Sequence, residues 1–105
     1  MDKSFIFKYD FWQQEGYAEY ISRKWKGDGK LKERIQYLIA EEQKEHSGTP
    51  VLLLPDSTIQ LLSYYKYGLV IQYLIEQENL DFPAIEKDER TLEEAYAEML
   101  KWSEG

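Results

Sequence analysis

The sequence predicts a single all-α domain, a small four-helix bundle-like fold, and three observations support this prediction. Apolar residues recur at helical spacing in four separate segments of the 105-residue chain. The segment from Thr58 to Ile75 is apolar on almost every side, so other elements must cover it from several directions. A domain of this length buries roughly 65% of the surface of its unfolded chain, which suffices for a core without disulfides.

The first helix is expected over about 10–26. Asp10 is its expected N-cap, because a carboxylate there accepts free N–H groups of the first turn. We expect Gly27 and Gly29 to end this helix and to turn the chain back into a helical hairpin, since glycine permits the positive φ angles of a tight reversal. A second, surface helix follows and ends near Ser47-Gly48. Its apolar stripe consists of Leu31, Ile35, Leu38 and Ile39.

Two prolines, Pro50 and Pro55, bracket the apolar segment Val51–Leu54. Because proline disfavours helix at the preceding residue, we expect this segment to be extended and packed across the core, or to form a short strand. The N-terminal Ser4–Tyr9, with its alternating pattern, is either a second short strand or the lead-in to the first helix.

The third helix is expected over about 57–78, with Asp56 or Ser57 as its cap, and should be the most buried of the four. Gly68 lies in its middle, where glycine costs roughly 1 kcal/mol relative to alanine. A close crossing of another backbone, a kink or a tolerated weakness would each explain this glycine.

The fourth helix is expected to begin at Thr91. Thr91 and Glu94 have the spacing of a capping box, in which each side chain satisfies a free backbone N–H group. A charged connection, Leu80–Arg90, should precede this helix. The apolar face of the fourth helix consists of Leu92, Ala95, Tyr96, Met99 and Leu100, with Trp102 at its end.

The composition argues against most catalytic chemistry. The chain has no cysteine, which excludes disulfides, thiolate zinc sites, iron–sulfur ligation and cysteine nucleophiles. The single histidine, His46, lies in a Glu-rich helix end, where a cation complements the helix dipole. Adjacent carboxylates such as Glu93 and Glu94 diverge around a helix axis and cannot flank one bond. We therefore expect no catalytic residue, metal or cofactor.

The two parts of the chain differ in charge. Residues 1–40 hold eight basic and six acidic side chains, whereas residues 41–105 hold five basic and fourteen acidic ones. A basic cluster around the hairpin turn could grip phosphates, so a nucleic-acid-binding helical protein is one hypothesis. The net charge of −7 opposes it, because the far field repels a polyanion. The cluster consists of Arg23, Lys24, Trp25, Lys26, Lys30, Lys32 and Arg34.

The preferred hypothesis is a small non-enzymatic protein that binds another protein, as a regulator or inhibitor. Nine Tyr, four Phe and three Trp form a heavy aromatic load, and aromatic residues dominate both cores and interface hot spots. An acidic surface would steer a basic partner toward the chain, or would imitate a nucleic acid. The expected partner-binding residues are Tyr64, Tyr65 and Tyr67 of the third helix and Glu93, Glu94 and Glu98 of the fourth.

A homodimer is a further expectation, because self-association would cover excess apolar surface. A small-ligand-binding or enzymatic domain with a pocket lined by Tyr and Trp ranks third. The apolar window Val51–Ile75 is interrupted by polar residues and Met1–Asp10 lacks the apolar run of a signal peptide. We therefore expect a soluble, cytoplasmic protein without a membrane-spanning segment.

Overall fold

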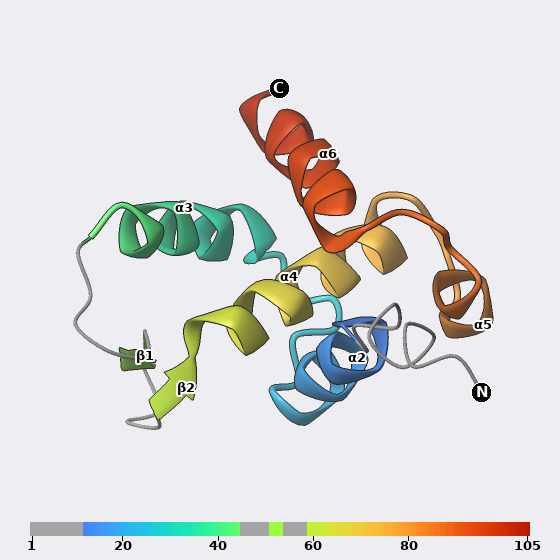
Figure 1. Cartoon of the computed structure of the whole chain (residues 1–105), viewed down its shortest axis with the longest axis horizontal. Helices are drawn as coiled ribbons and strands as arrows, with labels where there is room; N and C mark the ends of the chain where they lie inside the picture. Colours follow the sequence, from blue (N-terminus) through green and yellow to red (C-terminus); the bar gives the residue numbers. More distant parts are fainter. Residues whose placement is uncertain (1–11, 45–50, 54–58) are drawn as a thin grey trace, which may run out of the picture.

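The computed structural model describes residues 12–44, 51–53 and 59–105. These residues form five helices and one pair of short strands, which confirms the all-α prediction (Figure 1). Ser4–Tyr9, Asp10 and the caps Asp56 and Ser57 lie outside the described residues. The second helix ends at Glu42, about five residues before the predicted end near Ser47-Gly48, because the chain tightens into a turn there, in which the Lys44 N–H donates to the Glu41 carbonyl (3.3 Å). The elements are α2 (Trp12–Ser22), α3 (Leu31–Glu42), β1 (Val51–Leu53), β2 (Ile59–Leu61), α4 (Leu62–Glu76), α5 (Phe82–Glu86) and α6 (Leu92–Glu104).

Helix α4 is the centre of the fold, as its apolar sequence predicts. It runs through the middle of the molecule, with α2 on one side of it and α3 and α6 on the other (Figure 1). Eight of its residues are buried, and they point in all directions around the helix axis. They are Tyr65, Gly68, Leu69, Val70, Ile71, Gln72, Tyr73 and Leu74.

Helices α2 and α4 make the most extensive contact between any two elements, and a glycine of each helix lies in that contact. A Cβ atom at Gly16 would lie 2.5 Å from the backbone carbonyl oxygen of Tyr67. A Cβ atom at Gly68 would lie 2.8 Å from Trp25 Cζ3 and 3.0 Å from Glu19 Cβ. The close neighbours of Gly68 are thus side-chain atoms, chiefly the Trp25 ring, and not another backbone, whereas the close backbone approach occurs at Gly16.

Helix α2 ends at Ser22, four residues earlier than predicted, because the chain turns back so that Trp25 can reach the core. The Trp25 N–H donates to the Tyr20 carbonyl (3.3 Å) and the Lys24 N–H donates to the Ile21 carbonyl (3.1 Å). This pair of bonds is a Schellman motif with Lys24, at φ 60°, in the left-handed position. Gly27 (φ 69°) and Gly29 (φ 72°) then complete the reversal, as expected.

The predicted start of the third helix is wrong, because Ile59–Leu61 is a strand and α4 begins at Leu62. Leu61 still has extended backbone, with φ −65° and ψ 137°. β2 pairs antiparallel with β1, with Val51 opposite Leu61 and Leu53 opposite Ile59. The short-strand alternative for Val51–Leu54 is therefore confirmed over its described residues, Val51–Leu53. Val51 and Ile59 are β-branched residues, which favour strands, and the pairing satisfies backbone groups that a helix start would leave free.

The expected connection Leu80–Arg90 contains a short helix, α5. The Asp81 carboxylate accepts a hydrogen bond from the Ala84 N–H (3.0 Å), and Pro83 occupies the first turn, where its missing N–H costs nothing. Ile85 anchors α5 in the core. The capping box of α6 is present as predicted: the Glu94 N–H donates to Thr91 Oγ1 (3.2 Å), and the Thr91 N–H donates to Glu94 Oε1 (3.0 Å).

We predict that Gly16→Ala lowers the free energy of unfolding by about 1–3 kcal/mol, because the new methyl group would push α2 away from the Tyr67 carbonyl. Urea unfolding at neutral pH measures this change. The control is Ala18→Gly, at an exposed position of the same helix, which should cost only about 1 kcal/mol through helix propensity. A more stable Gly16→Ala variant would show that the two helices do not cross this closely.

We predict that Lys24→Gly stabilises the protein by about 1 kcal/mol, because glycine adopts the left-handed conformation without the Cβ clash that lysine suffers. Thermal unfolding monitored by circular dichroism checks this gain. Lys26→Gly, two residues along in the same exposed loop, is the control and should not stabilise. Equal effects of the two substitutions would contradict the Schellman geometry.

Candidate interaction surfaces

Tyr65 is a core residue and does not provide a surface anchor, contrary to the expectation. Its side chain is only 4% exposed and lies between two other rings. The ring centroid of Trp25 is 5.4 Å away and that of Tyr37 is 6.0 Å away, both with edge-to-face geometry. Burial raises the pKa of Tyr65 to about 12. The sequence could not show this, because an all-apolar helix does not reveal which side meets a neighbour.

Tyr64 and Tyr67 are half-buried, and their rings form an edge-to-face pair with centroids 5.8 Å apart. They lie near the start of α4, one helical turn apart. Lys66 points toward α3 and α6, because its Nζ donates to Glu42 of α3 (3.2 Å) and lies 3.9 Å from the ring centre of Tyr96 on α6. Two residues span 200° around a helix, so Tyr64 faces away from α6.

The acidic residues of α6 differ in their roles. Glu94 closes the capping box and Glu98 binds Arg90, with Oε2 at 2.6 Å from Nη1. Glu93 is exposed. Tyr64 and the acidic helix therefore do not form one continuous surface, and two of the three acidic side chains expected to bind a partner stabilise the fold instead.

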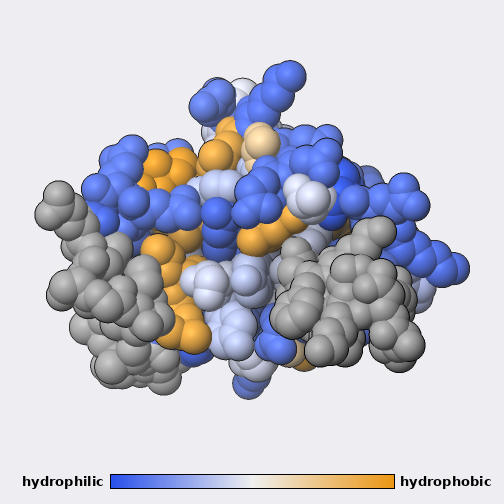
Figure 2. Space-filling model, viewed as in Figure 1, coloured by the Kyte–Doolittle hydropathy of each residue, from blue (hydrophilic) through white to orange (hydrophobic). Residues whose placement is uncertain are grey.

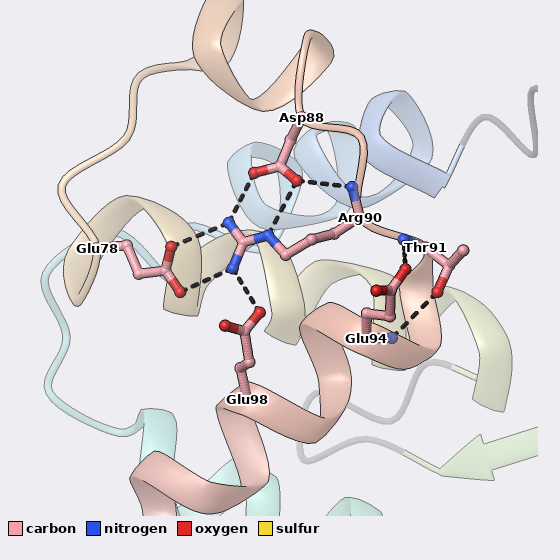
Figure 3. A network of polar contacts seen from close by, with 6 residues as sticks. All are labelled: Glu78, Asp88, Arg90, Thr91, Glu94 and Glu98. Atoms are coloured by element: carbon pink, nitrogen blue, oxygen red, sulfur yellow. Dashed lines mark hydrogen bonds and ion pairs between the residues drawn. The ribbon is translucent and has the colours of Figure 1, made fainter.

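Sequence reasoning missed the network around Arg90, which joins the end of α4, the α5–α6 connection and α6 (Figure 3). The guanidinium contacts Asp88 through Nε (2.9 Å) and Nη2 (2.6 Å), and contacts Glu78 through Nη1 (3.1 Å) and Nη2 (2.9 Å). Glu98 completes the network. The sequence shows one arginine among acidic residues immediately before a capping box. This pattern is equally typical of a charged loop that contacts only solvent.

The network shifts the acidity of its members. Hydrogen bonds from Arg90 hold the pKa of Glu78 and that of Asp88 below their usual ranges, against the opposing effect of partial burial. The same hydrogen bonds, from Asp88 first and then Glu78, raise the pKa of Arg90 further above its already high value. Burial and the contact with Glu78 raise the pKa of Tyr73 to about 12. The carboxylates of Glu78 and Asp88 therefore stay ionised at neutral pH.

Four of the seven residues of the expected basic patch contact other residues of the chain. Arg34 forms an ion pair with Asp28, donates to Gln72 Oε1 (3.0 Å) and stacks 4.4 Å from the ring centre of Trp25, which is itself buried. Three lysines of the patch, Lys24, Lys26 and Lys30, are exposed in the loop between α2 and α3. Of the other two, Arg23 pairs with Glu19 (3.5 Å), and Lys32 Nζ lies 5.0 Å from the ring centre of Trp102.

A polar cluster on α4 holds this loop in place, and the sequence analysis missed it as well. Gln72 is fully buried, and its Nε2 donates to the Trp25 carbonyl (3.2 Å). Glu76 accepts hydrogen bonds from the Gly27 N–H (3.0 Å) and from the Tyr20 hydroxyl (3.3 Å). Burial and the neighbouring Glu76 carboxylate raise the pKa of Tyr20 to about 12, so its hydroxyl remains a donor. These residues order the loop rather than form a reaction site.

The surface view shows hydrophilic residues over much of α3 and α6, with apolar colour in separate strips rather than one broad patch (Figure 2). Large hydrophobic side chains that are exposed in the described part of the chain are Ile21 and Tyr37. Among the described residues, no His, Cys, Asp or Glu side chains gather in threes to hold a metal ion. No described helix combines the length and apolarity needed to cross a membrane.

Comparison with protein-family models, with curated proteins and with solved structures found no match to this chain.

We predict that the stabilisation from the Arg90 network disappears in acid. Because the folded-state pKa values of Glu78 and Asp88 are lowered, their contribution is present above the unfolded values near 4 and is lost as pH falls through the folded ones. Urea unfolding should show Arg90→Met less stable at pH 7, by on the order of 1 kcal/mol after solvent screening. The difference should shrink steadily between pH 5 and pH 2.

The control for this titration is Lys101→Met, which removes an exposed cation of α6. Its effect on the free energy of unfolding should be small and should change little over the same pH range. An Arg90→Met effect that is as large at pH 2 as at pH 7 would mean that packing of the arginine stem, rather than its ion pairs, stabilises this junction.

Proposed function

We propose that this chain is a small non-enzymatic protein that acts by binding another protein, with the Tyr64/Tyr67 pair as the centre of the contact. The observation that carries the proposal is the geometry of this pair: two half-buried aromatic rings in edge-to-face contact on the most firmly packed helix. Tyrosines held in this way offer large contact area at little cost in conformational entropy, which is typical of interface hot spots.

The charge distribution supports a basic partner. Glu93 is exposed on α6, as are Glu86 and Glu89 around the end of α5, and the chain carries a net charge of −7. Such a field steers a positively charged protein toward the chain and raises the association rate. The tyrosine pair then supplies the short-range contact, while the acidic side chains act at longer range because α6 faces another side of α4.

Nucleic-acid binding has less support than protein binding. Four of the seven residues of the expected basic patch, Arg23, Trp25, Lys32 and Arg34, contact other parts of the chain. Asp28 lies within the same loop as the three exposed lysines and reduces their combined field.

We predict that Tyr64→Ala with Tyr67→Ala weakens binding of a captured partner at least about 10-fold, with the protein still folded, because hot-spot truncations cost more than about 1 kcal/mol. Light scattering first determines whether the chain associates with itself. Affinity capture with the unmutated chain as bait then supplies a partner, and titration by calorimetry measures the affinity of each variant.

The matched control is Ile21→Ala, which removes an exposed apolar side chain from α2 and should leave the affinity unchanged. Raising the salt concentration should slow association with the unmutated chain if the partner is basic. Loss of helical circular dichroism in the double tyrosine variant would show that these rings are core residues, and full affinity in a folded variant would refute the proposed contact.

A further inference from the structure

Helix α6 is attached to the molecule differently from α2. The contacts of α6 with α4 and with α3 are much less extensive than the contact between α2 and α4. Figure 1 shows α6 rising from the body, with its C-terminal end projecting beyond α3. Three of its side chains, Leu92, Ala95 and Met99, are buried, compared with eight residues of α4. Tyr96, Leu100 and Trp102 add partly buried apolar surface. The apolar contribution to docking α6 is therefore smaller than that of the central helix.

Polar and cation–π contacts supply much of the remaining attachment of α6. The Tyr96 hydroxyl donates to Glu42 of α3, and Lys32 of α3 lies over the ring of Trp102. On the opposite face of α6 from Tyr96, Arg90 binds Glu98 and joins it to Glu78 at the end of α4 (Figure 3). Glu42, Glu98 and Lys32 are all exposed to solvent, so water can replace these contacts at modest cost.

The surface that α6 covers belongs to the core. The ring of Trp102 packs against Tyr73 of α4, with centroids 5.8 Å apart, and Met99 is fully buried. Separation of α6 would therefore expose apolar side chains of α4 while leaving the α2–α4 contact and the loop held by Gln72 and Glu76 intact. Proteins commonly open in such contiguous units, at a lower free energy than global unfolding.

We propose that α6 is a hinged cover that opens as a unit from the body formed by α2, α3 and α4, with Arg90 as the latch. The hinge is the segment between α5 and α6, which contains Asp88 and Arg90. In the closed state, Arg90 bridges this segment, the end of α4 and Glu98 on α6 at once. In the open state, Arg90 keeps its ion pair with its neighbour Asp88, while Glu98 moves with α6 away from Glu78.

The inference does not depend on the proposed function, because opening is an equilibrium of the chain alone. Such opening gives a role to the network of Arg90 with three carboxylates, whose net charge is −2. One guanidinium offsets part of the mutual repulsion of three carboxylates, so its removal leaves three negative charges near one another and favours separation. A partner helix that binds the surface under α6 would first have to displace α6 itself.

Hydrogen exchange of the full chain, followed by mass spectrometry of peptides at neutral pH, tests this proposal. We expect amides of α6 to exchange at least about 10-fold faster than those of the middle of α4 in the unmutated protein. Arg90→Ala should accelerate exchange in α6 by a further factor of about 10 or more, with little change in α2. Arg90→Lys should restore part of the protection, because lysine keeps the charge without the bidentate geometry.

Lys101→Ala is the matched control, since it removes one exposed positive charge from the same helix and should leave the exchange pattern unchanged. If Arg90→Ala fails to fold, Glu98→Gln removes only the Arg90–Glu98 ion pair of the network. This substitution should accelerate hydrogen exchange in α6 selectively. Equal protection of α4 and α6 in the unmutated protein would overturn the proposal, and so would an Arg90 substitution that accelerates both helices equally.

Discussion

The close crossing of α2 and α4 is the constraint on which the rest of the fold depends. Gly16 brings the first of these helices within contact distance of the Tyr67 carbonyl, and Gly68 opens the space that Trp25 fills. With Trp25 fixed there, the chain must reverse immediately after α2, which sets the path of the loop and the start of α3. A dense packing interaction thus determines local backbone geometry, including the left-handed conformation of Lys24.

Charged residues in this protein mainly organise the fold. Glu76 and Gln72 hold the α2–α3 loop, Arg34 covers Trp25, and Arg90 joins α4 to α6. These contacts join different elements of the fold or the loops between them, so no short sequence motif indicates them. The same contacts remove side chains from the surfaces that sequence reasoning assigned to partners, and they leave the Tyr64/Tyr67 pair as the better supported candidate.

Periodicity and capping chemistry predicted the elements whose determinants are local. The helical class, the central position of α4 and the capping box of α6 follow from residues within one or two turns of one another. Strand β2, helix α5 and the burial of Tyr65 did not follow, because pairing with β1, anchoring of Ile85 and contact with Trp25 are tertiary effects. The sequence indicated which residue types a binding surface would use, but not which of those residues lie together on the surface, because that also depends on tertiary contacts.

The link between Tyr20 and Glu76 spans 56 positions in the sequence, and α3 forms between them. During synthesis, α2 therefore leaves the ribosome long before the helix that covers it, and its rings, including Trp12 and Tyr20, must wait in solvent. Closure of so long a loop costs entropy before any burial compensates it. Helix α2 is thus secured only after α4 has been made, and the nascent chain passes through a stage in which aromatic surface is open to chaperones or to aggregation.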